Sequence, residues 1–171
     1  MTNTHLVVMG VAGCGKSTVG RELATRLGWT LAEGDDFHPV SNIVKMSSGT
    51  PLTDDDRWPW LDSITAWTAE RDRAGESTVV TCSALRRVYR DRLRRAPGRT
   101  LFVHLAGSQE QLAARLTARP GHFMPLSLLP SQLATLEPLE PDEAGVVLDI
   151  AASVPELVEQ AIGRLGVSSS I

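Results

Sequence analysis

A short glycine-rich segment near the start of the chain constrains its fold more than any other feature. Residues 10–17 read GVAGCGKS, which is Gly-x4-Gly-Lys-Ser, and they lie between an apolar run and a helical pattern. In that context the glycines let the backbone N–H groups converge on one point, and the helix N-terminus adds partial positive charge. The segment therefore predicts a phosphate-binding loop for a nucleoside triphosphate. A glycine-rich turn without a ligand is the alternative.

Within this loop, Lys16 is expected to reach the β and γ phosphates and to act in catalysis, and Ser17 to bind Mg²⁺. The metal-binding carboxylate of such sites commonly ends the third strand, but that strand reads TVVTCSA here. Asp35 and Asp36 follow the second predicted strand, and of the two we favour Asp35 as the carboxylate that helps to bind Mg²⁺. The rest of the loop is expected to bind the nucleotide through Gly10, Val11, Ala12, Gly13, Cys14, Gly15 and Thr18.

Short apolar runs alternate with helical patterns along the chain. The runs predict five strands: Leu6–Met9, Thr30–Glu33, Thr78–Cys82, Leu101–Leu105 and Val146–Asp149. The patterns between them predict helices over Lys16–Leu27, Leu61–Ala74 and Leu85–Arg95, and capping boxes open two more at Ser108 and Ser153. This alternation predicts an α/β fold with a doubly wound five-stranded parallel sheet of the P-loop NTPase type. The length of 171 residues fits one domain over 1–171.

A long, polar, turn-rich segment, about 37–60, interrupts this alternation after the second strand. Because ligands bind beyond the carboxyl ends of parallel strands, we expect this insertion to hold the acceptor. Asp35 is predicted to take the proton of the acceptor hydroxyl, and its alternative role is a helix N-cap. Cations in and around the insertion indicate an anionic acceptor; we considered His38, Lys45, Arg57, Arg86, Arg90 and His122.

A lid is predicted at about 119–127. Arg115 and Arg119 lie four residues apart, and a PGHFMP segment follows them. Like charges at that spacing repel unless a polyanion lies near them, so we expect both arginines to bind the nucleotide. A lid would close over the triphosphate and exclude water. An ordinary helix end is the alternative.

Composition excludes other classes of function. The net charge of −3 gives no basic surface for a nucleic acid, and no apolar stretch has membrane-spanning length. Cys14 and Cys82 lie far apart without metal-ligand spacing, which is typical of a protein in the reducing cytoplasm. The first predicted strand begins so early that we expect no signal peptide.

Several segments outside the phosphate loop together resemble the small P-loop gluconokinases. They are 34–39 (GDDFHP), 42–46 (NIVKM), 49–52 (GTPL), 54–61 (DDDRWPWL), 82–85 (CSAL), 89–91 (YRD), 119–124 (RPGHFM) and 131–137 (SQLATLE). One departure is Arg86-Arg87, where members commonly carry Lys-Lys. The guanidinium of arginine is planar and can donate two parallel hydrogen bonds, whereas the ammonium of lysine donates from a single atom. The departure therefore affects the contact that Arg86 makes.

This resemblance implies a core like that of nucleoside monophosphate kinases and shikimate kinase, and a homodimer. It implies ATP- and Mg²⁺-dependent phosphorylation of D-gluconate at its 6-hydroxyl. The acceptor residues would be Asp35, His38, Lys45, Arg57, Arg86 and His122, and Ser17 and Asp35 would lie on the metal side. Two alternatives stay open: a kinase for another acceptor, such as shikimate or a nucleotide, and a nucleotide-binding switch with slow turnover.

Overall fold

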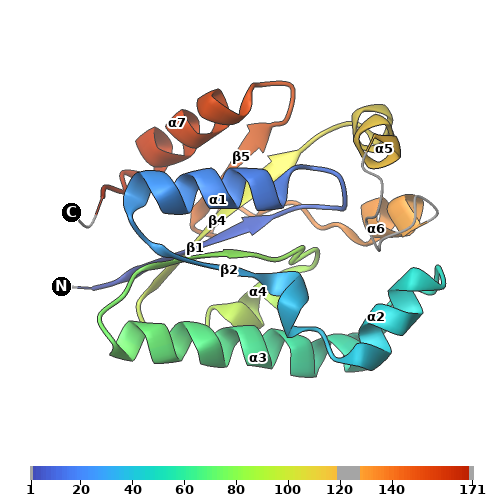
Figure 1. The fold of residues 1–171 in the computed structure, drawn as a ribbon, viewed down its shortest axis with the longest axis horizontal. Coiled ribbons are helices and arrows are strands. Elements are labelled where there is room, and N and C mark those ends of the chain that lie inside the picture. Colours follow the sequence, from blue (N-terminus) through green and yellow to red (C-terminus); the bar gives the residue numbers. More distant parts are fainter. Residues whose placement is uncertain (1, 119–127, 170–171) are drawn as a thin grey trace.

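The computed structural model describes residues 2–118 and 128–169 and contains a parallel sheet at its centre (Figure 1). Its strand order is β2-β3-β1-β4-β5, and all neighbouring strands are parallel. The predicted doubly wound five-stranded sheet is therefore confirmed. The strands are β1 Thr4–Met9, β2 Thr30–Glu33, β3 Thr78–Thr81, β4 Arg99–Ala106 and β5 Gly145–Asp149.

Strand β1 shows why the central strands read as continuous apolar runs. Successive side chains point to opposite faces, and both faces are covered. Leu6 and Val8 belong to one hydrophobic core, and Val7 and Met9 belong to the other. The edge strand β2 is only half-buried throughout, because it has a neighbour on one side only.

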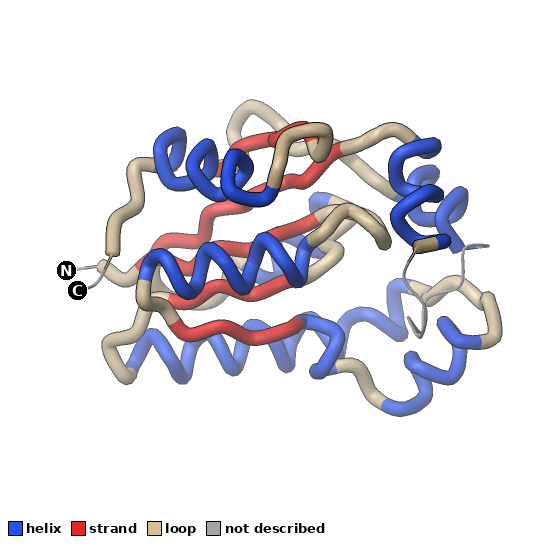
Figure 2. Tube along the Cα trace, turned by 45° about the horizontal axis from the view of Figure 1, so that its top comes forward, coloured by secondary structure: helices blue, strands red, loops and turns tan. Residues whose placement is uncertain are grey.

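Helices cover both faces of the sheet, as Figures 1 and 2 show. One face carries α1 (Lys16–Leu27) and α7 (Val154–Leu165), and the other carries α3 (Asp54–Arg73) and α4 (Arg87–Leu93). Three further helices lie near the end of the molecule to which the strands point; they are α2 (Val40–Ser47), α5 (Gln109–Thr117) and α6 (Leu129–Thr135). None of the helices within 2–118 and 128–169 is both long and apolar enough to cross a membrane.

Helix ends follow from local capping. Helix α1 has its predicted bounds and ends at Gly28, whose φ of 68° belongs to the left-handed region that favours glycine. The predicted capping boxes are present at the start of α5, at Ser108, and of α7, at Ser153. Helix α4 is shorter than the predicted Leu85–Arg95.

The insertion is more helical than we predicted. After a 3₁₀ turn, η1 (Gly34–Phe37), it forms α2, and its last residues belong to α3, which begins well before the predicted Leu61. The reason is a capping box, in which Asp56 N donates to Thr53 Oγ1 (3.2 Å) and Thr53 N donates to Asp56 Oδ2 (2.9 Å). The three aspartates at 54–56 form the first turn of α3, where carboxylates interact favourably with the helix dipole.

Candidate active site

The phosphate loop connects β1 to α1 in a conformation that requires glycine. Gly13 and Gly15 have φ of 86° and 96°. A Cβ at Gly13 would lie 2.9 Å from Leu112 O, so close packing also excludes a side chain there. Lys16 Nζ donates to the carbonyls of Gly10 (2.9 Å) and Val11 (3.2 Å). The lysine charge is therefore held over the loop.

The carboxylate that accepts a hydrogen bond from the Ser17 hydroxyl belongs to Glu33, and not to Asp35 or Asp36. Ser17 Oγ donates to Glu33 Oε2 at 3.0 Å, and Thr81 Oγ1 donates to the same oxygen at 2.6 Å. Glu33 ends β2 and pairs in register with Thr81, at the end of β3. The third strand thus contributes a threonine, and this threonine holds a glutamate of the neighbouring strand beside Ser17.

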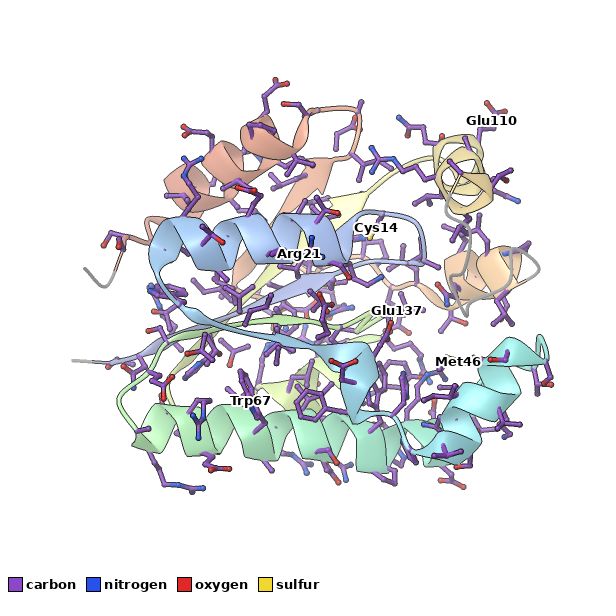
Figure 3. All side chains as sticks on the ribbon, viewed as in Figure 1. Cys14, Arg21, Met46, Trp67, Glu110 and Glu137 are labelled. Carbon is purple, nitrogen blue, oxygen red and sulfur yellow. The ribbon has the colours of Figure 1, made fainter. Side chains whose placement is uncertain are left out.

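One cleft of about 850 Å³, open solvent at its mouth included, joins the phosphate loop to the insertion. Lys16 and Ser17 line it together with Asp35, His38 and Arg57. Figure 3 marks the phosphate loop by Cys14 and the insertion by Met46 of α2, and Met46 also lines the cleft. Asp36 and Lys45 are not part of its lining.

His38 is a neutral group at physiological pH and not one of the cations of the site. Its ring is buried and stacks on Trp60, with centroids 4.0 Å apart and planes at 17°. Burial and the nearby Arg57 lower the pKa of His38 to about 4. His38 Nε2 lies 3.8 Å from Asp35 Oδ1. The side chain of Asp35 is about half exposed, at 49%.

Arg57 and Arg86 both lie beside Tyr89. Arg57 Nη1 donates to Tyr89 Oη (2.9 Å) and is 3.7 Å from Asp54 Oδ1. Arg86 lies 3.1 Å from Asp54 Oδ2 and 3.3 Å from Glu137 Oε2, and these contacts place it outside the lining of the cleft. Tyr89 Oη donates to Asp54, and burial together with this bond raises the pKa of Tyr89.

Two other cations considered as acceptor ligands are paired within the protein. Lys45 Nζ lies 2.6 Å from Asp56 Oδ2, which joins α2 to the start of α3. Arg90 is fully buried and donates twice to Glu143, at 2.7 and 2.9 Å. Burial raises the pKa of Glu143, but hydrogen bonds from Arg90 and from the Glu140 N–H outweigh it, and the pKa falls to about 2. Arg90 therefore belongs to the core.

Helices α5 and α6 each place a polar side chain against the phosphate loop. Arg115 Nη1 donates to Cys14 O (3.4 Å) and Nη2 to Ile150 O (2.7 Å), so this predicted nucleotide ligand lies next to the loop. From α6, Gln132 Oε1 accepts from the Ala12 N–H at 2.7 Å. Arg119, His122 and the predicted lid at 119–127 lie outside the described residues.

Comparisons with known proteins agree with this arrangement. The model of the AAA domain family matches residues 6–139. A gluconokinase of Gluconobacter oxydans is 57% identical over 159 residues, which cover 93% of this chain and 89% of the relative. The chain belongs to the gluconokinase family. The family resemblance of the sequence is thus confirmed.

Solved structures extend the gluconokinase match to three dimensions. The crystal structure of an unliganded sugar kinase from Janibacter sp. HTCC2649 has a TM-score of 0.93 at 52% identity, covering 96% of this chain and 95% of that one. A gluconokinase from Sinorhizobium meliloti 1021 has a TM-score of 0.85 at 50% identity, covering 96% and 93%.

Two residues that contact the segment 10–17 escaped the sequence prediction. Glu33 reads as an ordinary strand residue, and only its register with Thr81 reveals that it faces Ser17. Gln132 lies 120 residues from its partner Ala12. It occurs in one of the segments that carry the family resemblance, but that segment gives no sign of a contact with the loop.

Proposed function

We propose that this protein transfers the γ-phosphoryl group of ATP to the 6-hydroxyl of D-gluconate and releases 6-phospho-D-gluconate and ADP. The observation that carries the proposal is that Lys16 and Ser17 line the same cleft as Asp35 and Arg57. Phosphoryl transfer needs a donor site and an acceptor base in one enclosure. The family membership supports gluconate as the acceptor.

On the donor side, the loop N–H groups and Lys16 would bind the phosphates, with Arg115 beside them. Because charge on the transferred group changes in the transition state, a lysine held over the loop stabilises that state most. Arg119 remains a predicted second nucleotide arginine.

The metal side fits Mg²⁺. A hydroxyl and a carboxylate 3.0 Å apart, Ser17 and Glu33, are oxygen ligands of the kind this ion takes. Among residues 2–118 and 128–169, no cluster of three or more His, Cys, Asp or Glu side chains offers a cage for a metal. When bound, the ion would neutralise phosphate charge. Asp35 remains the second predicted carboxylate on this side.

On the acceptor side, Asp35 would accept the hydroxyl proton and Arg57 would bind the carboxylate of gluconate. A half-exposed carboxylate at the cleft is accessible to a polyol chain. His38 would contribute as an uncharged hydrogen-bond donor. Lys45, Arg86 and His122 remain predicted acceptor ligands, and the first two would have to exchange their present carboxylate partners.

An ADP-release assay with ATP and Mg²⁺ tests the proposal against its alternatives. The acceptors are a panel of sugar acids, shikimate and nucleoside monophosphates, and Lys16→Ala is the inactive control. We expect turnover with gluconate and its loss in Lys16→Ala, with the fold unchanged by circular dichroism. Turnover with shikimate or a nucleotide alone would identify another kinase. Weak ATPase activity that no acceptor changes would indicate a switch.

Two broader expectations accompany this proposal. As in the family, the protein would be a homodimer, which light scattering after size-exclusion chromatography tests directly. It would act in the cytoplasm, in agreement with Cys14 and Cys82, which are both free thiols.

A further inference from the structure

The side chain of Asn42 is buried where α2 meets the start of α3, and its orientation is fixed. Asn42 Nδ2 donates to the backbone carbonyl of Asp56 at 2.9 Å. A carbonyl oxygen only accepts hydrogen bonds, so the atom of the Asn42 amide that faces it must be the nitrogen.

This orientation determines the proton position on His38. The same Asn42 Nδ2 lies 3.2 Å from His38 Nδ1. An amide nitrogen donates two hydrogens and accepts none, so one goes to Asp56 O and the other to the ring nitrogen. His38 Nδ1 must therefore be a bare acceptor, and a neutral ring carries its proton on Nε2. A protonated ring would carry a hydrogen on Nδ1 as well, so this contact also requires the ring to be neutral.

The ring is also fixed in space, with Nε2 directed toward Asp35. It stacks on Trp60, whose Nε1 donates to Gly34 O at 2.8 Å, on the residue before Asp35. His38 Nε2 lies 3.8 Å from Asp35 Oδ1, and both residues line the cleft. A small movement of the half-exposed Asp35 side chain would bring it within hydrogen-bond distance.

We propose that Asn42 holds His38 as an Nε2–H donor and that this N–H orients the Asp35 carboxylate toward the acceptor hydroxyl. The inference rests on the proposed function, in which Asp35 is the base. A neutral donor orients a carboxylate and lowers its basicity less than an imidazolium would, because the positive charge of an imidazolium further stabilises the ionised form. Asn42 and His38 are positioning residues that act through Asp35.

The proton position is measured independently of activity by ¹⁵N NMR of the protein labelled at histidine. We expect His38 to carry its proton on Nε2 at pH 7, with Nδ1 bare. In Asn42→Asp the carboxylate can only accept, so the proton should move to Nδ1, while the signals of His5 stay unchanged. A proton on Nδ1 of His38 in the wild-type protein would overturn the inference.

Two substitutions of His38 test the role in catalysis and leave the Asn42–Asp56 contact in place. Glutamine can place an N–H near the position of Nε2, and asparagine reaches only the position of Nδ1. We expect kcat to fall about 10- to 100-fold in His38→Asn and clearly less in His38→Gln, with the KM for ATP unchanged in both. Equal losses of kcat in the two variants would refute the donor role. If the His38 ring were purely structural, glutamine would not be expected to restore kcat better than asparagine.

A third comparison separates this inference from the proposed function. If His38 acts through Asp35, His38→Asn should cost no further kcat in an Asp35→Asn background. A full, additive loss there would refute the inference even though gluconate is the substrate. If Asp35→Asn keeps a near-normal kcat, the base role fails, and the inference fails with it. If the wild-type protein does not phosphorylate gluconate, the proposed function fails first.

Discussion

The buried pair of Arg90 and Glu143 gives a prediction whose magnitude follows from the structure. Both side chains are fully buried, and two hydrogen bonds join them. Arg90 also donates to Ala84 O (2.9 Å), on a non-glycine residue with a φ of 46°. The pair therefore holds a strained turn next to Ser83, which lines the cleft. Replacing Glu143 by glutamine keeps the shape and leaves the Arg90 charge without an anionic partner.

The lowered pKa of Glu143 sets the expected cost. A fall from 4.5 to about 2 corresponds to about 3 kcal/mol at neutral pH, because each tenfold change in the ionisation constant is worth about 1.4 kcal/mol. Breaking a buried ion pair by removing one partner typically costs about 3–5 kcal/mol. We therefore expect Glu143→Gln to lower the free energy of unfolding by about 3 kcal/mol and the Tm by about 6–12 °C.

Urea unfolding followed by tryptophan fluorescence measures this loss. A group whose pKa is lower in the folded protein stabilises it above its unfolded pKa, and this contribution disappears as the pH falls from 4.5 toward 2. The difference between wild type and variant should thus be constant from pH 6 to 8 and narrow below pH 4.5. Glu159→Gln, which removes the partner of Arg26 in an exposed pair, should cost at most about 1 kcal/mol. The reasoning would be refuted if Glu143→Gln lowered the free energy of unfolding as little as Glu159→Gln does. It would also be refuted if the stability difference between wild type and Glu143→Gln stayed constant below pH 4.5.

Three further predictions concern the cleft. Arg57→Ala should raise the KM for gluconate about 10- to 100-fold with little change in that for ATP, because a charged hydrogen bond is worth about 1.5–3 kcal/mol; an unchanged KM would assign the carboxylate to another cation. Glu33→Gln should raise the Mg²⁺ concentration needed for half-maximal activity about tenfold or more, whereas Asp36→Asn should leave it unchanged. Initial rates measured over a range of Mg²⁺ concentrations test this. A larger effect of Asp36→Asn than of Glu33→Gln would contradict the proposal that Ser17 and Glu33 hold the metal. Gln132→Ala frees the Ala12 N–H and should lower kcat/KM for ATP about fivefold, a loss of about 1 kcal/mol, while the exposed Gln109→Ala matches wild type in the same assay.

The sequence predicts the sheet because the physical causes of its strands are local. A strand covered on both faces is largely apolar, and β1 and β3, which are buried at every position, carry the apolar runs Leu6–Met9 and Val79-Val80. Helix starts at Ser108 and Ser153 are equally readable, since each capping box lies within four residues. The capping box at Thr53 uses aspartate in place of glutamate or glutamine. This capping box lies in a segment that we expected to be turn-rich. For that reason the predicted start of the helix, at Leu61, comes later than the observed start at Asp54.

The site depends on contacts between distant residues, which composition and spacing do not reveal. Arg57 and Arg90 are both helical arginines, yet one lines the cleft and the other is buried against Glu143, 53 residues away. Sequence spacing cannot distinguish them, because the difference arises from where the segment around Glu143 packs. The same holds for Glu33, whose position opposite Thr81 is set by the register of β2 on β3.

The pairing of cations also narrows how an anionic acceptor would be bound. Lys45 lies 2.6 Å from Asp56, and Arg86 lies within 3.3 Å of two carboxylates. Arg57 has a more distant carboxylate, at 3.7 Å, and it alone of these three lines the cleft. Partners within the protein offset the charge of Lys45 and Arg86, so an incoming carboxylate gains most at Arg57. Of the predicted acceptor cations among the described residues, Arg57 is thus the one that we expect to bind the carboxylate of the acceptor, and we expect Asp35, oriented by His38, to contact its hydroxyl.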